Sequence, residues 1–358
     1  MYNLEVPNSS EVIVSNIVKD VPNQSAAFLV TAYSFFFIIG HFLLFRSGVS
    51  FLGRDFINPQ DFTCKELKSL LWTATDLKHN FKEKKIKAMD LLQNHNATIL
   101  LNAPHLKVQV AVTNAIRLLG ATVNVIVDKR WETLASVCDG GRCLSGMTDI
   151  IIAKSEQHES MQHLRDGSSV PVINYGCGTF KPLQVLADLL TLQERYGHLK
   201  GLKLGWVGPP EGLFNTYVVM CPRMGMNIQF TCSCVPDFPT SPAMFDVAAK
   251  NCIQHNTEIA EFTTAEEAIY RVDVIATTLH EKSNMHINRE MVREAAVNWT
   301  FLHDLPRSKV EVSDDVFYSP NSKVWESSSN MTWVTMAVVL HLLKDYQQSI
   351  EMPNFDGE

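Results

Sequence analysis

The sequence lacks the marks of nucleic-acid-binding and metal-binding proteins. Its net charge of −7 gives no excess of Lys and Arg that could follow a phosphate backbone, so we do not expect nucleic acid as a partner. Its eight cysteines are scattered without the paired spacing of zinc sites. We therefore expect reduced thiols, no bound metal and no cofactor.

Arginine is also missing from the first 45 residues, which contain acids such as Glu5 and Asp20. A mitochondrial transit peptide would be rich in Arg and Ser and poor in acids. Residues 26–45 carry no formal charge and are long enough to cross a bilayer, which takes about 20 residues. Because Arg46 follows them, the positive-inside rule would keep the rest of the chain cytoplasmic. The sequence leaves open whether the leader, residues 1–50, inserts in a membrane or never does.

The remaining 308 residues alternate short apolar runs with helical patterns, in a chain of 358 residues that is 46% hydrophobic and 19% charged. Such alternation predicts an α/β protein with parallel sheets, and the length suggests two domains. Strands are expected at 98–101, 122–127, 149–153, 170–174, 202–207, 227–231, 272–276 and 299–302.

Three helices stand out in the sequence. Thr63 precedes an apolar stripe and reads as the N-cap of the first. Residues 183–196 form a long helical pattern that joins the first series of strands to the second. Residues 333–346 have a continuous apolar face and close the chain as a last helix.

Two segments, Lys181–Glu194 and Trp299–Arg307, resemble the ornithine carbamoyltransferase family, and the resemblance extends over about 53–352. It implies two parallel-sheet α/β domains of the aspartate/ornithine transcarbamoylase type joined by a helix. The implied carbamoyl-phosphate-type domain comprises 51–185 together with the C-terminal helix at 333–350, and the implied amino-acid-binding-type domain comprises 186–332.

The phosphate cradle of this family is altered in the sequence. The family's S-T-R-T-R loop corresponds to His105–Gln109, in which Lys107 alone keeps a positive charge. The planar guanidinium group of arginine donates two parallel hydrogen bonds to phosphate oxygens, which the ammonium group of lysine cannot do. Two lost charge-assisted bonds at about 1.5–3 kcal/mol each would weaken phosphate binding at least about a hundredfold. Arg142 matches the arginine of the family's D-T-A-R segment, so Lys107 and Arg142 are the candidate phosphate-binding residues.

The catalytic positions implied by the resemblance are partly retained. Lys181 replaces the histidine of the H-P-x-Q motif, and a cation there could still stabilise an oxyanion. Gln184 keeps the glutamine of that motif, and His303 keeps the histidine of H-C-L-P. The candidate catalytic residues are Lys181, Arg142, Gln184 and His303. Alternatively, the retained residues are relics held by buried partners, and Lys107 and Lys181 are solvated.

The amino-acid side departs further from the family pattern. Residues 209–212 replace a D-G-x-N-N loop, and residues 278–284 replace the D-x-W-x-S-M-G lid. Asp304 stands where the family has the cysteine of H-C-L-P. The candidate amino-acid-binding residues are Asp304, Leu305 and Arg307.

These observations support two main hypotheses about function. In the first, the chain is a catalytically degenerate relative of ornithine carbamoyltransferase that acts as an assembly or regulatory subunit. Because family enzymes are trimers, it would form a homotrimer or a mixed trimer with an active paralogue. In the second, it is an active carbamoyltransferase that converts carbamoyl phosphate and ornithine, or a related amine, to a citrulline-type product and phosphate.

A third hypothesis is a membrane-tethered ligand-binding domain, anchored through residues 26–45. The resemblance implies a mitochondrial location, whereas the hydrophobic leader favours a membrane anchor with a cytoplasmic domain. In every case the expected ligands are carbamoyl phosphate or phosphate and an amino acid.

Overall fold

The computed structural model describes residues 50–86, 89–133, 136–232, 242–281 and 283–357. The hydrophobic segment 26–45 and nearly all of the leader lie outside these residues. Among the residues that are described, no helix is both long and apolar enough to span a membrane.

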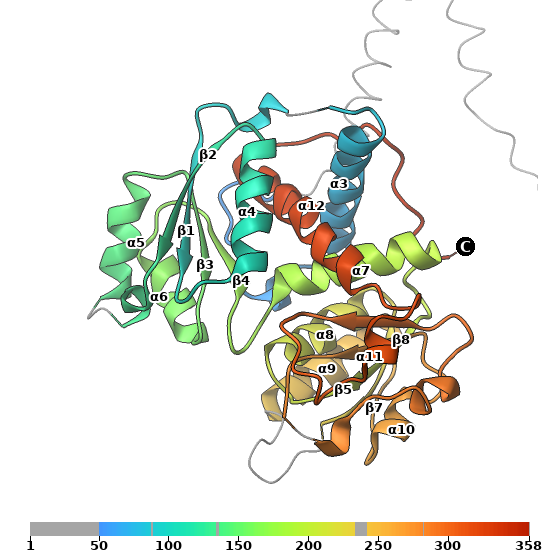
Figure 1. Ribbon diagram of the computed structural model, residues 1–358. Coiled ribbons are helices and arrows are strands. Elements are labelled where there is room, and N and C mark those ends of the chain that lie inside the picture. The colour runs from blue at the N-terminus through green and yellow to red at the C-terminus, as the bar shows by residue number, and fades with distance from the viewer. Residues whose placement is uncertain (1–49, 87–88, 134–135, 233–241, 282, 358) are drawn as a thin grey trace, which may run out of the picture. The chain divides into compact units, whose positions relative to one another are not determined.

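The first half of the described chain contains a four-stranded parallel sheet in the order β2-β1-β3-β4 (Figure 1). The strands β1 and β3 are almost completely buried, as expected for central parallel strands covered on both faces. The edge strand β2 is mostly exposed. The bounds are β1 (Asn96–Leu101), β2 (Thr122–Val127), β3 (Ile150–Lys154) and β4 (Val172–Gly176).

The second half contains a five-stranded parallel sheet in the order β7-β6-β5-β8-β9. Its central strand β5 contributes Trp206, which is fully buried against aromatic rings on the neighbouring helix. The bounds are β5 (Lys203–Val207), β6 (Asn227–Thr231), β7 (Ile259–Glu261), β8 (Val274–Thr277) and β9 (Thr300–His303).

Helices accompany both sheets, and their starts follow local sequence signals. The predicted cap at Thr63 is confirmed: its side chain accepts from the Glu66 amide, and the Glu66 carboxylate accepts from the Thr63 amide at 2.7 Å. The helices of the first half are α3 (Cys64–Lys82), α4 (Leu106–Leu118), α5 (Val137–Ser145) and α6 (His158–Gly167). Those of the second half are α8 (Gly212–Arg223), α9 (Pro242–His255), α10 (Ala265–Ile269) and α11 (Asp314–Phe317).

Helix α7 (Pro182–Tyr196) connects the two halves, as predicted from its long helical pattern. Nearly all of its residues are buried, and it ends at Gly197, whose φ of 80° is the left-handed conformation that glycine adopts without strain. Helix α12 (Val324–Leu343) packs against α3, α4 and α7, so the C-terminal part of the chain returns to the first half (Figure 1).

The predicted bounds of the last helix were wrong. Helix α12 runs over Val324–Leu343 rather than 333–346. Ser327 and Asn330 interrupt the apolar pattern of its first turns, but both are buried and bonded to α7. Ser327 Oγ donates to Asp188 Oδ1 at 2.5 Å, and Asn330 Nδ2 donates to Thr191 Oγ1 at 2.9 Å. Polar residues with buried partners thus extend the helix over a segment where hydrophobic periodicity alone predicts no helix.

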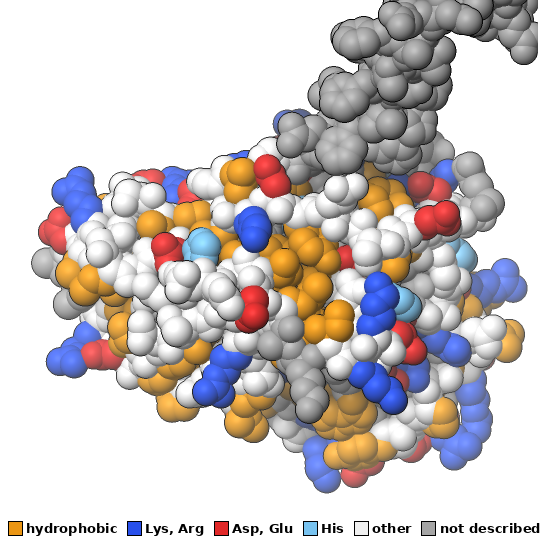
Figure 2. Space-filling view, turned by 90° about the horizontal axis from the view of Figure 1, so that it is seen from above, with side chains coloured by type: hydrophobic (Ala, Val, Ile, Leu, Met, Phe, Trp, Pro, Cys, Tyr) orange, Lys and Arg blue, Asp and Glu red, His pale blue; other side chains and the backbone are white. Residues whose placement is uncertain are grey.

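The α/β class with two parallel sheets is confirmed. Residues 50–358 form one compact unit, in which both sheets are joined through α7. The domain bounds 51–185 and 186–332 stay a prediction. On the face shown in Figure 2, hydrophobic side chains gather near the middle and charged side chains lie around them.

Candidate functional site

Three lysines lie where strands of the first sheet end. Lys107 is in the first turn of α4, after β1; Lys154 is the last residue of β3; and Lys181 directly precedes α7, after β4. The carboxyl ends of parallel strands meet at one edge of a sheet, which is where α/β proteins commonly bind ligands. We call Lys107, Lys154 and Lys181 the lysine cluster.

Lys107 is held by two acceptors. Its Nζ donates to Gln184 Oε1 at 2.7 Å and to the backbone carbonyl oxygen of Asp304. Burial lowers the pKa of its ammonium, and the negative charges of Asp304 and Asp188 only partly oppose that effect.

Lys181 forms an ion pair with Asp304, which follows strand β9 of the second sheet. Its Nζ lies 2.5 Å from Asp304 Oδ2, while Thr278 Oγ1 donates to the other carboxylate oxygen at 2.8 Å. Asp304 is 6% exposed. Burial alone would raise the pKa of this carboxyl group, but Lys181 and Lys107 outweigh burial and lower it. A carboxylate from the second half therefore pairs with Lys181 and offsets part of the positive charge of the lysine cluster.

Lys154 is the member of the cluster that the sequence analysis missed. Among the described residues its Nζ has no hydrogen-bond or ion-pair partner. Burial lowers the pKa of its amine, and the neighbouring charge of Lys181 lowers it further. A Cβ atom on Gly176 would lie 3.8 Å from Lys154 Nζ and 3.6 Å from Lys181 Cγ, so the glycine leaves room beside both side chains. The sequence signal for Lys154 was its position directly after the apolar run 150–153.

His105 also lies close to the cluster. Burial lowers the pKa of its imidazole, and the positive charges of Lys154, Lys181 and Lys107 lower it further. It occupies the N-cap position of α4 without a side-chain bond to the helix. The site therefore gathers four nitrogen-bearing side chains, the three lysines and His105.

Gln184 links the lysine cluster to a buried network between α7 and α12. Its Oε1 accepts from Lys107, and its Nε2 donates to Asp188 Oδ1 at 3.0 Å and to Ser327 Oγ at 3.1 Å. Tyr217 OH donates to the second oxygen of Asp188 at 2.7 Å. Burial raises the pKa of Asp188 to about 6, although these hydrogen bonds lower it.

Arg142 is not brought to the lysine cluster. It lies in the last turn of α5, and its side chain is 73% exposed. Its nearest acidic partner is Asp139, one turn earlier, at 3.8 Å. A helix residue that faces solvent cannot supply a charge to a site at the carboxyl ends of the strands, so we leave Arg142 out of the candidate site.

His303 is held by buried partners. The Leu305 amide donates to its Nδ1 at 2.9 Å, so Nε2 carries the proton and donates to Glu311 Oε1 at 3.1 Å. Both side chains are fully buried. Burial would raise the pKa of Glu311, but hydrogen bonds from His303 and Ser308 lower it to about 2. Leu305 packs against the hydrophobic core of the second sheet.

Arg307 is held by the second half as well. It lies 2.6 Å from Asp314 Oδ1, donates to the Val312 carbonyl oxygen at 2.7 Å, and stacks over Phe317 with 4.3 Å to the ring centroid. Its side chain is only 6% exposed. Of the candidate amino-acid-binding residues, Asp304 contacts the lysine cluster, whereas Arg307 is occupied elsewhere.

The segment that replaces the family's D-G-x-N-N loop lies against the first half. A Cβ atom on Gly212, at the start of α8, would come within 2.6 Å of the Cys177 carbonyl oxygen and 3.0 Å of that of Gly178. Asn215 Nδ2 donates to the Thr179 carbonyl oxygen at 3.2 Å. These contacts hold the two halves against each other beside Lys181.

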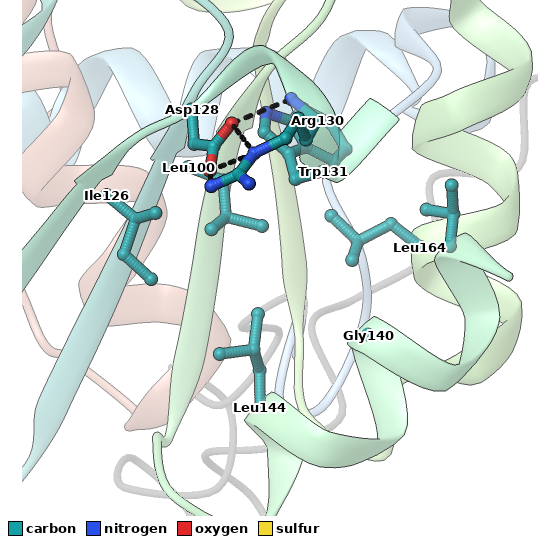
Figure 3. Close-up of a pocket in the computed structure, with 9 residues that line it drawn as sticks. Leu100, Ile126, Asp128, Arg130, Trp131, Gly140, Leu144 and Leu164 are labelled. Atoms are coloured by element: carbon teal, nitrogen blue, oxygen red, sulfur yellow. Dashed lines mark hydrogen bonds and ion pairs between the residues drawn. The ribbon is translucent and has the colours of Figure 1, made fainter. Parts of the chain in front are cut away.

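A pocket of about 300 Å³ lies away from the lysine cluster, between the first sheet and α5 (Figure 3). None of the candidate residues lines it. Arg130 and Asp128 form an exposed ion pair at its edge, 2.6 Å apart, and the other side chains drawn are mainly apolar. The lysine cluster, rather than this pocket, is the site with the chemistry of anion binding.

Comparison with known proteins accounts for both halves. Residues 54–194 match the family described as "Aspartate/ornithine carbamoyltransferase, carbamoyl-P binding domain", and residues 200–342 match its "Asp/Orn binding domain". The chain has the transcarbamoylase fold and belongs to the aspartate/ornithine carbamoyltransferase family.

Within this family the chain is similar to ornithine carbamoyltransferases. It is 32% identical to the mitochondrial ornithine transcarbamylase of Gallus gallus, over 87% of this chain and 91% of that protein. The mitochondrial ornithine carbamoyltransferase of Aquarana catesbeiana is 29% identical over 85% of this chain and 90% of that protein. The solved structure of ornithine carbamoyltransferase from Pyrococcus furiosus superposes with a TM-score of 0.77, at 25% identity, over 83% of this chain and 99% of that chain.

Proposed function

We propose that this chain is a divergent ornithine carbamoyltransferase paralogue with little or no carbamoyl-transfer activity of its own, and that it acts as an assembly or regulatory subunit. The observation that carries the proposal is the contact of Asp304 with the lysine cluster. The Asp304 carboxylate already pairs with the positive charge to which a carbamoyl phosphate dianion would have to bind.

The energetics of anion binding support this proposal. An incoming dianion has to break the 2.5 Å ion pair between Lys181 and Asp304 and leave the 6%-exposed carboxylate without its cation. Removing one partner of a buried ion pair costs about 3–5 kcal/mol, which corresponds to a hundredfold or more in affinity. Lysines also bind phosphate as point charges and lack the paired donors of arginine.

The acceptor side supports it too. Asp304 is the group that could meet the side-chain amine of ornithine, but Lys181 and Thr278 already engage both of its oxygens. Arg307 is engaged by Asp314, and His303 by Glu311. The polar groups of this site that could bind an amino acid are therefore already bonded to one another.

An exposed apolar surface favours a role in assembly. Leu106 and Val110 are one helical turn apart on α4 and are 84% and 51% exposed. Hydrophobic side chains also gather on the face shown in Figure 2. Exposed apolar surface of this kind is typical of contacts between proteins. The proposed assembly is a homotrimer or a mixed trimer with an active paralogue.

Two measurements test the proposal. A steady-state assay of the purified protein with carbamoyl phosphate and ornithine should give no citrulline above background, and citrulline at ordinary enzymatic rates would refute it. Size-exclusion chromatography with light scattering, on the protein alone and after co-expression with an active ornithine carbamoyltransferase, should show trimers. A monomer in both samples would refute the assembly role.

A second candidate function is an active carbamoyltransferase with a rebuilt site. The observation that favours it is Lys154, which adds a third amine to Lys107 and Lys181 at the same edge of the sheet. A ligand held by the native state must stabilise it, by about 2.7 kcal/mol at a concentration of 100 times Kd. This candidate therefore requires that millimolar carbamoyl phosphate raise the Tm of the protein.

A further inference from the structure

We propose that Lys154 is a site of covalent carbamoylation, at which the chain's own amine accepts the carbamoyl group of carbamoyl phosphate. This inference goes beyond the proposed function, which requires no chemistry at the lysine cluster. It also assigns a role to a side chain that neither the ion pair nor the buried network uses.

The contacts of the three lysines single out Lys154. Lys107 donates to Gln184 and to the Asp304 carbonyl oxygen, and Lys181 is paired with the Asp304 carboxylate. Lys154 Nζ has no hydrogen-bond or ion-pair partner in the described part of the chain. Its nitrogen is therefore the one member of the cluster that can approach an electrophile without first breaking a bond to the protein.

Gly176 leaves a small space open beside Lys154. Gly176, the last residue of β4, has no side chain there, and a Cβ atom would lie 3.8 Å from Lys154 Nζ. Lys181 borders the same space, since its Cγ would lie 3.6 Å from that atom. An anionic electrophile beside Gly176 would contact the paired ammonium of Lys181 and the unpaired amine of Lys154.

The charges around Lys154 favour its neutral, nucleophilic form. Burial and the adjacent charge of Lys181 lower the pKa of its amine, whereas Asp304, Cys177 and Glu132 raise it less strongly. The neutral fraction at neutral pH is thus larger than for a solvent-exposed lysine.

Cys177 is the competing nucleophile nearby, but it is 2% exposed. Its Sγ accepts from the Phe180 amide at 3.3 Å and from Asn174 Nδ2 at 3.4 Å. The thiol is therefore shielded and bonded, which leaves the lysine as the acceptor.

The reaction is an acyl transfer from an acyl phosphate. The lone pair of Lys154 Nζ attacks the carbonyl carbon, a C–N bond forms, and the C–O bond to phosphate breaks. Phosphate leaves with the electron pair, and the proton lost by the amine passes to phosphate or water. The product is an uncharged carbamoyl-lysine, so the modification removes one positive charge from the lysine cluster and is not turned over.

Peptide mass mapping of the full-length protein after incubation with fresh carbamoyl phosphate tests the proposal. We expect the mass of one carbamoyl group on the peptide that contains Lys154, several-fold sooner than on peptides with the exposed Lys309 or Lys129. The labelling rate of Lys154 should also reach its plateau at a pH below the usual range for a lysine amine. Equal labelling of the exposed lysines, or none at Lys154, would overturn the proposal.

A parallel incubation with cyanate at the same concentration separates attack on carbamoyl phosphate from reaction with its breakdown product. Cyanate carries no phosphate, so we expect the preference for Lys154 to fall. An unchanged preference would overturn the stated reaction.

Two matched variants complete the test. Lys154→Arg keeps the charge and should abolish the adduct at this position, and Lys309→Arg should leave the rate at Lys154 unchanged. The assay is independent of the proposed function: citrulline production would refute that function whether or not Lys154 is labelled, and missing label refutes only this inference.

Discussion

Replacing Asp304 by asparagine tests whether this residue acts as an internal anion in the lysine cluster. Asparagine has nearly the same shape and keeps an oxygen that can accept from Thr278 or Lys181, but it has no charge. The change therefore removes the negative charge that pairs with Lys181, while leaving the packing of a 6%-exposed side chain nearly intact.

The structure gives the expected magnitude. A charge-assisted hydrogen bond of about 1.5–3 kcal/mol becomes a neutral one of about 0.5–1.5 kcal/mol. Lys181 is 28% exposed, so water restores part of its solvation. The free energy of unfolding of Asp304→Asn should fall by about 1–2 kcal/mol relative to the wild type. Inorganic phosphate should then bind the unpaired lysines and restore about 2.7 kcal/mol at 100 times its Kd.

Urea unfolding with and without phosphate, at constant ionic strength, measures both effects. Asp315→Asn is the matched control, because it makes the same chemical change at an exposed position outside the cluster. We expect phosphate to stabilise Asp304→Asn clearly more than the wild type or Asp315→Asn. Equal stabilisation of all three proteins would refute the idea that Asp304 occupies an anion site.

Three other substitutions test the surroundings of the site. Burial raises the folded-state pKa of Asp188 from 3.8 to about 6, so the stability it contributes is fully present below pH 3.8 and is lost as pH rises through 6. Relative to the wild type, Asp188→Asn should therefore gain about 2 kcal/mol of unfolding free energy between pH 4 and 6.5. His341, whose pKa burial lowers to about 4, acts in both proteins and cancels in this difference; a constant difference would contradict the reasoning. Gly212→Ala should lower stability by about 1–3 kcal/mol in urea unfolding, because its Cβ would collide with the Cys177 carbonyl oxygen; an unchanged urea midpoint would argue against that close contact. Arg307→Met should cost a similar amount without changing the response to phosphate, and an altered response would place Arg307 in the anion site.

Much of the fold could be predicted from the sequence because short buried strands carry strong local signals. The strands 122–127 and 227–231 have the predicted bounds, and the other predicted strands differ by a few residues at their ends. The start of α12 could not be predicted in this way. It depends on Asp188 and Thr191, which lie far away in the sequence and satisfy its buried polar residues.

Most residues of the candidate site could be picked out from the sequence, but their arrangement could not. Lys107, Lys181 and Asp304 each stand out against the family pattern, yet no local signal shows that Asp304, more than a hundred residues later, contacts both lysines. Lys154 follows a buried strand without a motif of its own. Arg142 matches a family motif, but its position on the exposed side of α5 removes it from the site.

The return of α12 to the first half has a consequence for synthesis on the ribosome. Helices α3 and α4 pack against α12, which begins at Val324. Their apolar faces therefore stay uncovered until one of the last segments of the chain has been synthesised. Domains generally fold in the order in which they emerge. Here the first half of the described chain is completed last, and a nascent chain stopped before residue 324 would keep the buried sides of α3 and α4 exposed to chaperones and proteases.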